Sequence, residues 1–191
     1  MTIIETDNII LRDFQESDIE KRIEWDTKDR EWQDWDAPWE KEPVPEGEAL
    51  ENARQTYQSM ADMASKKSSG DMRYSFQIEV RETGEYIGWI NCYCIDNNYS
   101  YTEDDGKYAF GIDIPPKSCR GKGYGYEAFH AVLNYLKIHG LDEIYTQTWS
   151  GNTRMVALAE KLGFVEINRK KDLRIVNGQK YDGLSFIYKG E

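Results

Sequence analysis

Hydrophobic residues recur along the chain with two different periods, and these periods predict a mixture of strands and helices. Apolar residues alternate with polar ones in stretches such as 74–80, which is typical of half-buried strands. From Tyr124 to His139 the apolar spacing is three to four residues, as on one face of a helix. We expect strands near 9–12, 74–80, 86–95, 108–114, 144–149, 165–175 and 181–189, and helices over 17–26, 47–65, 124–139 and 153–162.

Turn signals connect these elements into one order. Thr83-Gly84-Glu85 and Asn177-Gly178 are typical hairpin turns, and the three strands between 74 and 114 follow one another as an antiparallel meander. The full order is β-α-α-β-β-β-α-β-α-β-β, with no internal repeat and no disordered linker. This pattern predicts a mixed α/β fold, and 191 residues fit one domain.

Charge is concentrated in the N-terminal quarter. The formal net charge is −11, and residues 13 to 51 contain 15 acids and 5 bases, a balance of −10. Four of the six tryptophans lie in the same stretch, which Pro38, Pro43 and Pro45 break into short pieces. We therefore expect an acidic, indole-rich wall or lid. A protein this acidic, without a basic patch interleaved with aromatics, is not expected to bind nucleic acid.

Cysteine and histidine are too few and too poorly spaced for a usual zinc site, so we expect no metal. The three cysteines are Cys92, Cys94 and Cys119, and the two histidines are His130 and His139. An odd cysteine count without a disulfide framework favours a reducing cytoplasm. The N-terminus has no export signal and no stretch has 18 consecutive apolar residues, so we expect no membrane association.

The sharpest local motif is the glycine-rich segment Arg120-Gly121-Lys122-Gly123-Tyr124-Gly125 between a predicted strand and the helix it opens. Glycines let several backbone N–H groups point into one concavity, and the helix N-terminus adds partial positive charge. The segment therefore predicts a phosphate or diphosphate site, with Arg120 and Lys122 as countercharges. A nucleotide-binding P-loop is excluded because no Gly-Lys-Ser/Thr closes the motif.

Two alternatives to a diphosphate site come from the same glycines. Gly123-x-Gly125-x-x-Ala128 matches the dinucleotide-binding fingerprint, with acids at Asp142 and Glu143. Those acids lie at the beginning of the next strand instead of its end, and antiparallel hairpins surround the motif, which argues against a nicotinamide site. The other alternative is a tight turn alone, but three alternate glycines flanked by Arg and Lys exceed what a turn needs.

At these residues the chain resembles a known family. Arg120-Gly121-Lys122-Gly123-Tyr124-Gly125 is similar to the acyl-CoA pyrophosphate loop of the GNAT N-acetyltransferases, and 152–164, ending in Glu-Lys-Leu-Gly-Phe, is similar to their cofactor-contacting helix. The opening Asp7–Arg12 and the closing 177–183 resemble the RimJ/RimL-like branch. The resemblance spans nearly the whole chain and implies a mostly antiparallel central sheet with a splayed pair of parallel strands and helices on both faces.

The resemblance implies direct acetyl transfer from acetyl-CoA to a primary amine within a single domain, 1–191. Residues 107–164 would form the acetyl-CoA-binding core, and the acidic, Trp-rich part 13–66 would line the acceptor site. Pro115-Pro116 would end strand pairing and leave backbone donors free for the thioester oxygen. The residues expected to bind the cofactor are Ile112, Asp113, Ile114, Arg120, Gly121, Lys122, Gly123, Tyr124, Gly125 and Asn152.

The catalytic residues are less well defined by this resemblance. Asn152 matches a family position that contacts the cofactor arm and orders water, but it also suits a helix N-cap. The usual acid positions hold Ala159 and Met155, which leaves Ser150, a water, or no acid at all. A protonated amine cannot attack, so a base is required. Asp113, or an acid from 13–51 acting through water, is the candidate.

The acidic, Trp-rich stretch suggests a cationic acceptor, because carboxylates attract cations and indole faces add cation–π attraction. A cationic small molecule or a peptide N-terminus would fit. The alternative is that the tryptophans only anchor the segment to the core. A non-catalytic acetyl-CoA sensor is the alternative function, and exposed strand edges make a homodimer one expected assembly. The acceptor-site candidates are Trp32, Trp35, Asp36 and Trp39.

Overall fold

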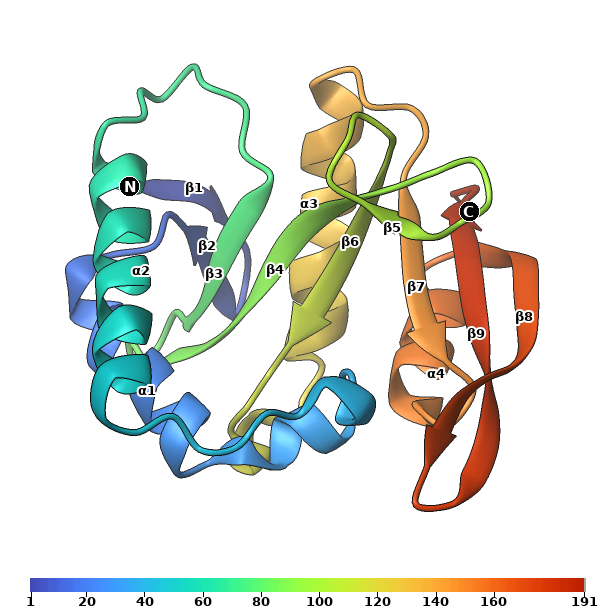
Figure 1. The fold of residues 1–191 in the computed structure, drawn as a ribbon. Helices are drawn as coiled ribbons and strands as arrows, with labels where there is room; N and C mark the ends of the chain where they lie inside the picture. Colours follow the sequence, from blue (N-terminus) through green and yellow to red (C-terminus); the bar gives the residue numbers. More distant parts are fainter. Residues whose placement is uncertain (191) are drawn as a thin grey trace.

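The computed structural model describes residues 1–190 as nine strands, four α-helices and four 3₁₀ turns (Figure 1). The strands are β1 Thr2–Glu5, β2 Ile9–Arg12, β3 Ser75–Val80, β4 Tyr86–Ile95, β5 Tyr101–Thr102, β6 Lys107–Asp113, β7 Tyr145–Trp149, β8 Phe164–Val176 and β9 Gln179–Tyr188. The helices are α1 Ile19–Thr27, α2 Gly47–Ser65, α3 Tyr124–Ile138 and α4 Thr153–Lys161. The 3₁₀ turns are η1 Glu16–Asp18, η2 Arg30–Asp34, η3 Pro38–Glu40 and η4 Lys117–Cys119.

All nine strands join one sheet in the order β1-β2-β3-β4-β6-β7-β9-β8, with β5 paired to β4. Every neighbouring pair is antiparallel except β6 and β7, which run parallel. The predicted mixed α/β fold with a mostly antiparallel sheet and one parallel pair is confirmed. The strands β1 and β5 were not expected, and β5 lies between the strands expected near 86–95 and 108–114.

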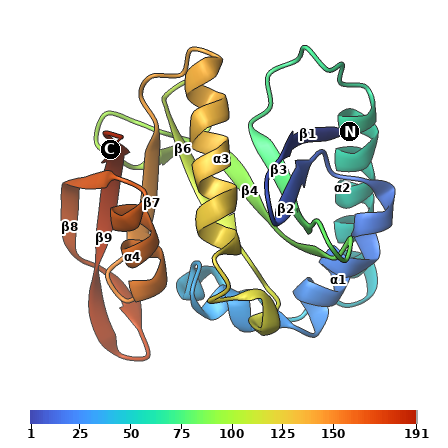
Figure 2. The same ribbon diagram turned by 180° about the vertical axis from the view of Figure 1, so that it is seen from behind.

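The sheet separates two helical layers. Residues of α3 and α4 pack with one face of the sheet in the largest core cluster, which includes Phe110, Phe129 and Phe186. Figure 2 shows α3 and α4 in front of the sheet. On the other face, Trp25 of α1 packs against Trp89 of β4 with ring centroids 5.8 Å apart. Helices therefore cover both faces, as expected.

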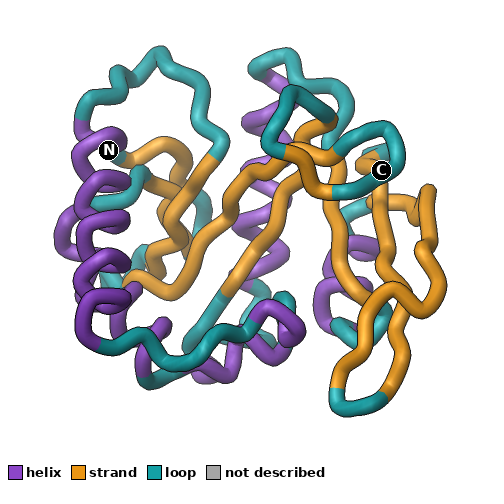
Figure 3. Tube along the Cα trace, viewed as in Figure 1, coloured by secondary structure: helices purple, strands orange, loops and turns teal. Residues whose placement is uncertain are grey.

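Between α1 and α2 the chain forms only short turns and loops, visible along the lower edge of Figure 3. Proline explains part of this. Pro38 can begin η3 because its missing N–H is not needed there, whereas Pro43 and Pro45 shortly after η3 prevent it from continuing as a longer helix. This segment, which carries Trp32, Trp35 and Trp39, crosses from the α1 side of the molecule toward β7 and α4.

Buried ion pairs fix the start of this N-terminal part. Arg12 donates to both carboxylate oxygens of Asp18 at 2.7 and 2.8 Å, and Arg73 donates to Asp13 at 2.9 and 3.2 Å. All four side chains are almost fully buried. Because each charge has a hydrogen-bonded partner, the pairs fix where β2 leaves the sheet and α1 begins.

Two negative findings concern residues 1–190. No helix in this part of the chain combines the length and hydropathy that a membrane span needs. The same residues contain no group of three or more His, Cys, Asp or Glu side chains arranged to hold a metal ion.

Candidate active site

The site begins where β6 and β7 separate. The two strands share a single residue pair, Ala109 with Tyr145, and the buried Thr146 hydroxyl then donates to the Phe110 carbonyl at 2.8 Å. Beyond this point β6 pairs only with β4, up to Asp113 with Trp89. One edge of β6 is therefore open, and a cavity of about 1490 Å³ lies at this opening.

The glycine turn forms one end of the cavity. Gly121 and Gly123 have φ of +74° and +91°, which only glycine adopts readily, and Gly123 is the N-cap of α3. A Cβ placed on either residue would meet no heavy atom within 4 Å, so the backbone borders open space. The N-terminus of α3 thus presents N–H groups and partial positive charge to the cavity.

An acid in the first turn of α3 is held away from this end of the cavity. Glu127 accepts from the Thr6 hydroxyl at 2.5 Å, the Asn8 backbone N–H at 2.8 Å and the Asn8 side chain at 2.9 Å. Burial raises the pKa of Glu127, but these hydrogen bonds outweigh it and the net pKa is lowered. Glu127 is therefore ionised and directed toward the loop between β1 and β2.

Arg120 bonds to the Trp-rich segment instead of standing free beside the turn. Its Nε donates to the Ile114 carbonyl at 2.7 Å, Nη2 to the Pro115 carbonyl at 2.6 Å, and Nη1 to Glu31 Oε2 at 2.5 Å. Arg120, predicted as a countercharge to a diphosphate, therefore uses all three guanidinium nitrogens within the protein, and its role toward a diphosphate stays a prediction. Gly121, Gly123 and Gly125 line the cavity, whereas Lys122 and Tyr124 do not.

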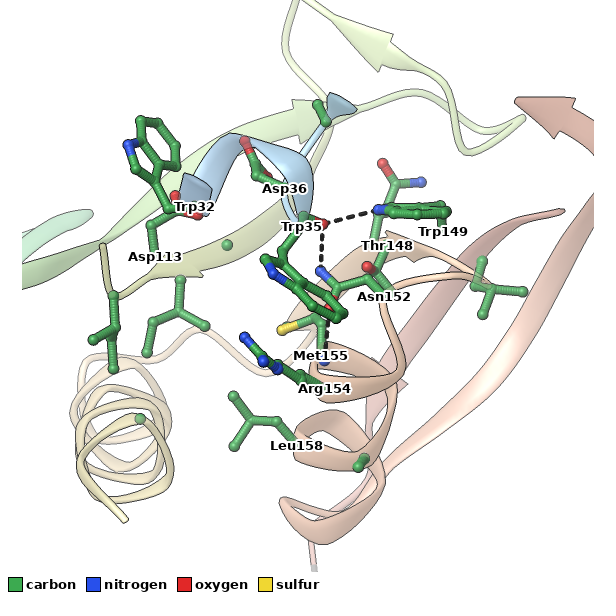
Figure 4. Close-up of a pocket in the computed structure, with 18 of the residues that line it drawn as sticks. Trp32, Trp35, Asp36, Asp113, Thr148, Trp149, Asn152, Arg154, Met155 and Leu158 are labelled. Atoms are coloured by element: carbon green, nitrogen blue, oxygen red, sulfur yellow. Dashed lines mark hydrogen bonds between the residues drawn. The ribbon is translucent and has the colours of Figure 1, made fainter. Parts of the chain in front are cut away.

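The Trp-rich segment closes the other side of the cavity (Figure 4). The Trp35 carbonyl accepts from Trp149 Nε1 at 2.9 Å and from Asn152 Nδ2 at 2.7 Å. Glu31 accepts from Trp35 Nε1 at 3.0 Å. Residues 31–36 therefore connect the glycine turn after β6 to the β7–α4 junction, and they span the opening between the two strands.

The indole rings of this wall already have partners inside the protein. Arg154 lies 3.9 Å from the Trp35 ring centroid and Arg174 lies 4.3 Å from that of Trp39. Trp32 packs edge-on against Trp89 and donates its Nε1 to the Trp25 carbonyl. One face of Trp35 and of Trp39 is thus taken by an arginine. A cationic acceptor can use only what these contacts leave open.

Two carboxylates face the same cavity without an ion pair or hydrogen bond from residues 1–190. Burial raises the pKa of Asp113 well above its usual value, the nearby Asp36 raises it further, and Arg22 and Arg120 lower it. Burial and then Glu40 raise the pKa of Asp36. Figure 4 shows both carboxylates on the side of the cavity where the Trp-rich segment passes β6. A carboxylate with a raised pKa is suited to take a proton near neutral pH.

Comparison with known proteins gives this geometry a family. Residues 8–165 match the family described as the acetyltransferase (GNAT) domain. The chain belongs to the GNAT acetyltransferase family. Enzymes of this family are acetyl-CoA-dependent acyltransferases. No curated protein sequence matches the chain.

Solved GNAT structures share the fold at low sequence identity. A RimL ribosomal L7/L12 alpha-N-protein acetyltransferase in complex with coenzyme A aligns with a TM-score of 0.72 at 16% identity, covering 98% of this chain and 97% of that one. A ribosomal-protein-S5-alanine acetyltransferase from Vibrio fischeri gives 0.70 at 16%, covering 98% and 96%. A spermidine N-acetyltransferase chimera from Vibrio cholerae and hSSAT gives 0.62 at 20%, covering 95% of each.

Two predicted catalytic residues of this GNAT chain have structural bonds. Asn152 Oδ1 accepts from the Met155 N–H at 3.1 Å as the N-cap of α4, while Nδ2 holds Trp35. Ser150 does not line the cavity, and its hydroxyl oxygen accepts from the Asp182 N–H at 2.9 Å. Asn152 therefore lies in the cavity with its amide engaged, and Ser150 is directed toward β9.

Several lining residues were not identified from the sequence. They come from faces of β4, β7 and β9 that only the sheet register brings together, and from the loop after β4. Alternation along 144–149 places Gln147 and Trp149 on one face, which was the one available signal. The lining residues in question are Asn91, Tyr93, Tyr99, Gln147, Thr148, Trp149 and Ser185.

Proposed function

We propose that the protein is an N-acetyltransferase that moves the acetyl group of acetyl-CoA directly to a primary amine. The observation that carries the proposal is the single cavity in which three features meet: the glycine turn at the start of α3, the open edge of β6, and the carboxylates of Asp36 and Asp113. The first two features suit the coenzyme, and the third suits an amine.

The coenzyme half of the site is built from backbone. The N–H groups between Gly121 and Gly125 would hold the diphosphate, because they border open space at a helix N-terminus. The pantetheine arm would pair with Ile112, Asp113 and Ile114, which line the cavity along the open edge of β6. Donors in this position can also stabilise negative charge on the thioester oxygen.

Asp113 is proposed as the base for the acceptor. An alkylammonium must lose a proton before it can attack, and a carboxylate with a raised pKa takes that proton near neutral pH. Asp36 lies beside it, so the proton can pass to Asp113 directly or through a water held between the two carboxylates. We assign no general acid, because a thiolate is a tolerable leaving group close to its own pKa.

The acceptor is proposed to be a cationic small molecule or a peptide N-terminus. Asp36 and Asp113 attract an ammonium group, and Trp32, Trp35 and Trp39 supply apolar surface around it. Two of the solved structures described above are named as acetyltransferases of ribosomal proteins, one of them as an alpha-N-protein acetyltransferase, and one is named as a spermidine N-acetyltransferase, which is consistent with either class.

The coenzyme assignment is tested with Gly123→Asp. A carboxylate beside the diphosphate N–H groups should abolish coenzyme A binding in calorimetry, because it competes for those donors and repels the phosphates. Gly84→Asp is the matched control: Gly84 has φ +69°, its Cβ direction is equally open, and it lies in a remote hairpin turn. Equal coenzyme A affinity in all three proteins would refute the proposed site.

Turnover is tested with an amine panel once binding is established. Wild type with acetyl-CoA should release coenzyme A faster with spermidine or a free tripeptide than with neutral or anionic amines. Coenzyme A binding without release for any amine would instead favour a non-catalytic sensor. That alternative has one structural observation in its favour, since Met155 and Ala159, at the usual acid positions, are buried and carry no hydroxyl.

A further inference from the structure

Glu31 occupies the junction between the two halves of the site, and both of its carboxylate oxygens are used. Oε2 accepts from Arg120 Nη1 at 2.5 Å, and Oε1 accepts from Trp35 Nε1 at 3.0 Å and lies 4.0 Å from Lys117 Nζ. Burial raises the pKa of Glu31, but the hydrogen bonds from Trp35 and Arg120 outweigh it and lower the net pKa. The carboxylate therefore stays charged at neutral pH.

On one side Glu31 is connected to the coenzyme half. Arg120, the first residue of the glycine turn motif, also donates from Nε and Nη2 to the carbonyls of Ile114 and Pro115, immediately after β6. The Arg120 side chain is only 18% exposed, and three acceptors together fix the position of its guanidinium. Through Arg120, Glu31 is therefore connected both to the end of β6 and to the glycine turn.

On the other side Glu31 is connected to the acceptor half. Trp35 is held by Glu31 at its indole nitrogen and by Trp149 and Asn152 at its carbonyl. Asp36 is the next residue, so its place beside Asp113 depends on where Trp35 is held (Figure 4). Trp35 and Asp36 also donate their backbone N–H groups to the Trp32 carbonyl at 3.0 and 3.2 Å, so residues 32–36 form one hydrogen-bonded turn.

We propose that Glu31 is a positioning residue that locks the turn 32–36, and with it Asp36, to the coenzyme half of the site. The inference rests on the proposed function for its kinetic consequence but not for its structural one. Other acids of the segment lack this geometry: Glu40 binds Trp39 beside it, and Asp34 pairs with Lys41. Only Glu31, among the acids from 30 to 40, bonds to the turn motif.

If Glu31 holds the turn 32–36 in this way, replacing it should lower kcat but leave the affinity for coenzyme A unchanged. Glu31→Gln keeps an acceptor for the Trp35 indole but loses the charge that Arg120 binds, and Glu31→Ala loses both. We expect kcat to fall about 10-fold in Glu31→Gln and further in Glu31→Ala, the effect of losing one charge-assisted hydrogen bond. Coenzyme A affinity should stay within about two-fold in both, since the backbone donors of the turn are untouched.

The pH dependence of kcat distinguishes the proposed role of Glu31 from a general loss of stability. Asp113 is faced by Asp36, Arg22 and Arg120, and Asp36 raises its pKa. If Asp36 moves away when Glu31 is removed, the pKa of Asp113 falls and the acid limb of kcat shifts to lower pH. A folding defect would scale the whole profile without moving it.

The experiment uses the full chain, spermidine and the tripeptide Ala-Ala-Ala as acceptors, and Glu42→Gln as the matched control. Glu42 lies in the same segment, and its replacement by Gln removes the same charge. Its side chain makes no hydrogen bond or ion pair with residues 1–190 and does not line the cavity. Hydrogen exchange over residues 30–40 is measured in parallel. We expect about 10-fold faster exchange in Glu31→Ala and no change in the control.

The outcomes separate this inference from the proposed function. Faster exchange, lower kcat, a shifted acid limb and unchanged coenzyme A affinity would support the lock. Exchange and kinetics equal to the control would overturn it, as would coenzyme A affinity falling in step with kcat. If wild type releases no coenzyme A with either amine, the proposed function fails, and the exchange measurement alone then decides whether Glu31 holds the segment.

Discussion

Gly151 is a position at which one added carbon should disturb the site strongly. A Cβ built there would lie 1.8, 2.4 and 2.5 Å from three ring carbons of Trp149. Real carbon contacts are about 3.5–4.0 Å, so Gly151→Ala must displace the indole. The ring cannot yield freely, because it is buried, donates to Trp35, and packs edge-on against Tyr181 and Trp39 with centroids 4.8 and 6.0 Å away.

The cost follows from these contacts. Overpacking of a core typically costs about 1–3 kcal/mol, and the lost hydrogen bond to Trp35 adds about 0.5–1.5 kcal/mol. We therefore expect Gly151→Ala to lower the free energy of unfolding by about 2–4 kcal/mol. For a chain of this size that is a fall in Tm of roughly 5–15 °C. Turnover should fall too, because Trp149 helps to hold Trp35 over the site.

Differential scanning calorimetry and the acetyl-transfer assay check this prediction. Gly70→Ala is the control, since a Cβ at Gly70 meets nothing within 4 Å and its φ is not in the left-handed region. Its Tm should match wild type or exceed it slightly. If Gly151→Ala and Gly70→Ala have the same Tm and the same kcat, Trp149 is not held as described, and the contacts proposed between Trp149 and Trp35 do not shape the site.

Three further predictions use other parts of the molecule. Asp113→Asn should raise Tm at about pH 8 while lowering kcat. The pKa of Asp113 is raised in the folded protein, so the wild type loses stability as pH rises through that pKa. Asparagine does not ionise, and the difference in Tm between variant and wild type should therefore shrink toward about pH 4. Arg73→Ala should lower the free energy of unfolding by about 3–5 kcal/mol in urea titration, because Asp13 stays buried without the two guanidinium hydrogen bonds and keeps, among residues 1–190, only the Met1 ammonium, 3.7 Å away; wild-type stability would contradict this. Gly125→Ala should leave Tm unchanged or raise it, since the added Cβ meets Ile114 at an ordinary 3.4 Å and alanine favours helix. It should weaken coenzyme A binding in calorimetry because it narrows the cavity, and unchanged affinity would place the diphosphate elsewhere.

Local signals were sufficient to predict most of the fold. Alternation over 74–80, the helical spacing after Tyr124 and the Asn177-Gly178 turn each determine an element through contacts within a few residues, and the structure has β3, α3 and the β8–β9 hairpin there. The missed strands had no such signal. β5 has two residues, and β1 is a four-residue edge strand whose apolar pair, Ile3 and Ile4, shows no alternation.

The site was only partly predictable, for a physical reason. Glycines that expose backbone are visible in a sequence, so the turn at 121–125 could be predicted as a candidate binding feature, and three of its glycines line the cavity. Side-chain direction depends on long-range partners: Arg120 bonds to Glu31, 89 positions away, and Asn152 to the Trp35 carbonyl, 117 positions away. Local hydrophobic periodicity indicates neither of these partners. The directions of the Arg120 and Asn152 side chains could therefore be found only from the three-dimensional arrangement.

The attachment of Glu127 to the first loop has a practical consequence for handling the protein. A carboxylate one turn along α3 would be an intramolecular competitor for the same amides that are proposed to receive phosphate. Direct hydrogen bonds from Thr6 and Asn8 hold that carboxylate toward the loop between β1 and β2, away from those amides. An N-terminal fusion or trimming that disturbs residues 6–8 can therefore weaken a ligand it never touches, and affinity tags are better attached to the other end of the chain.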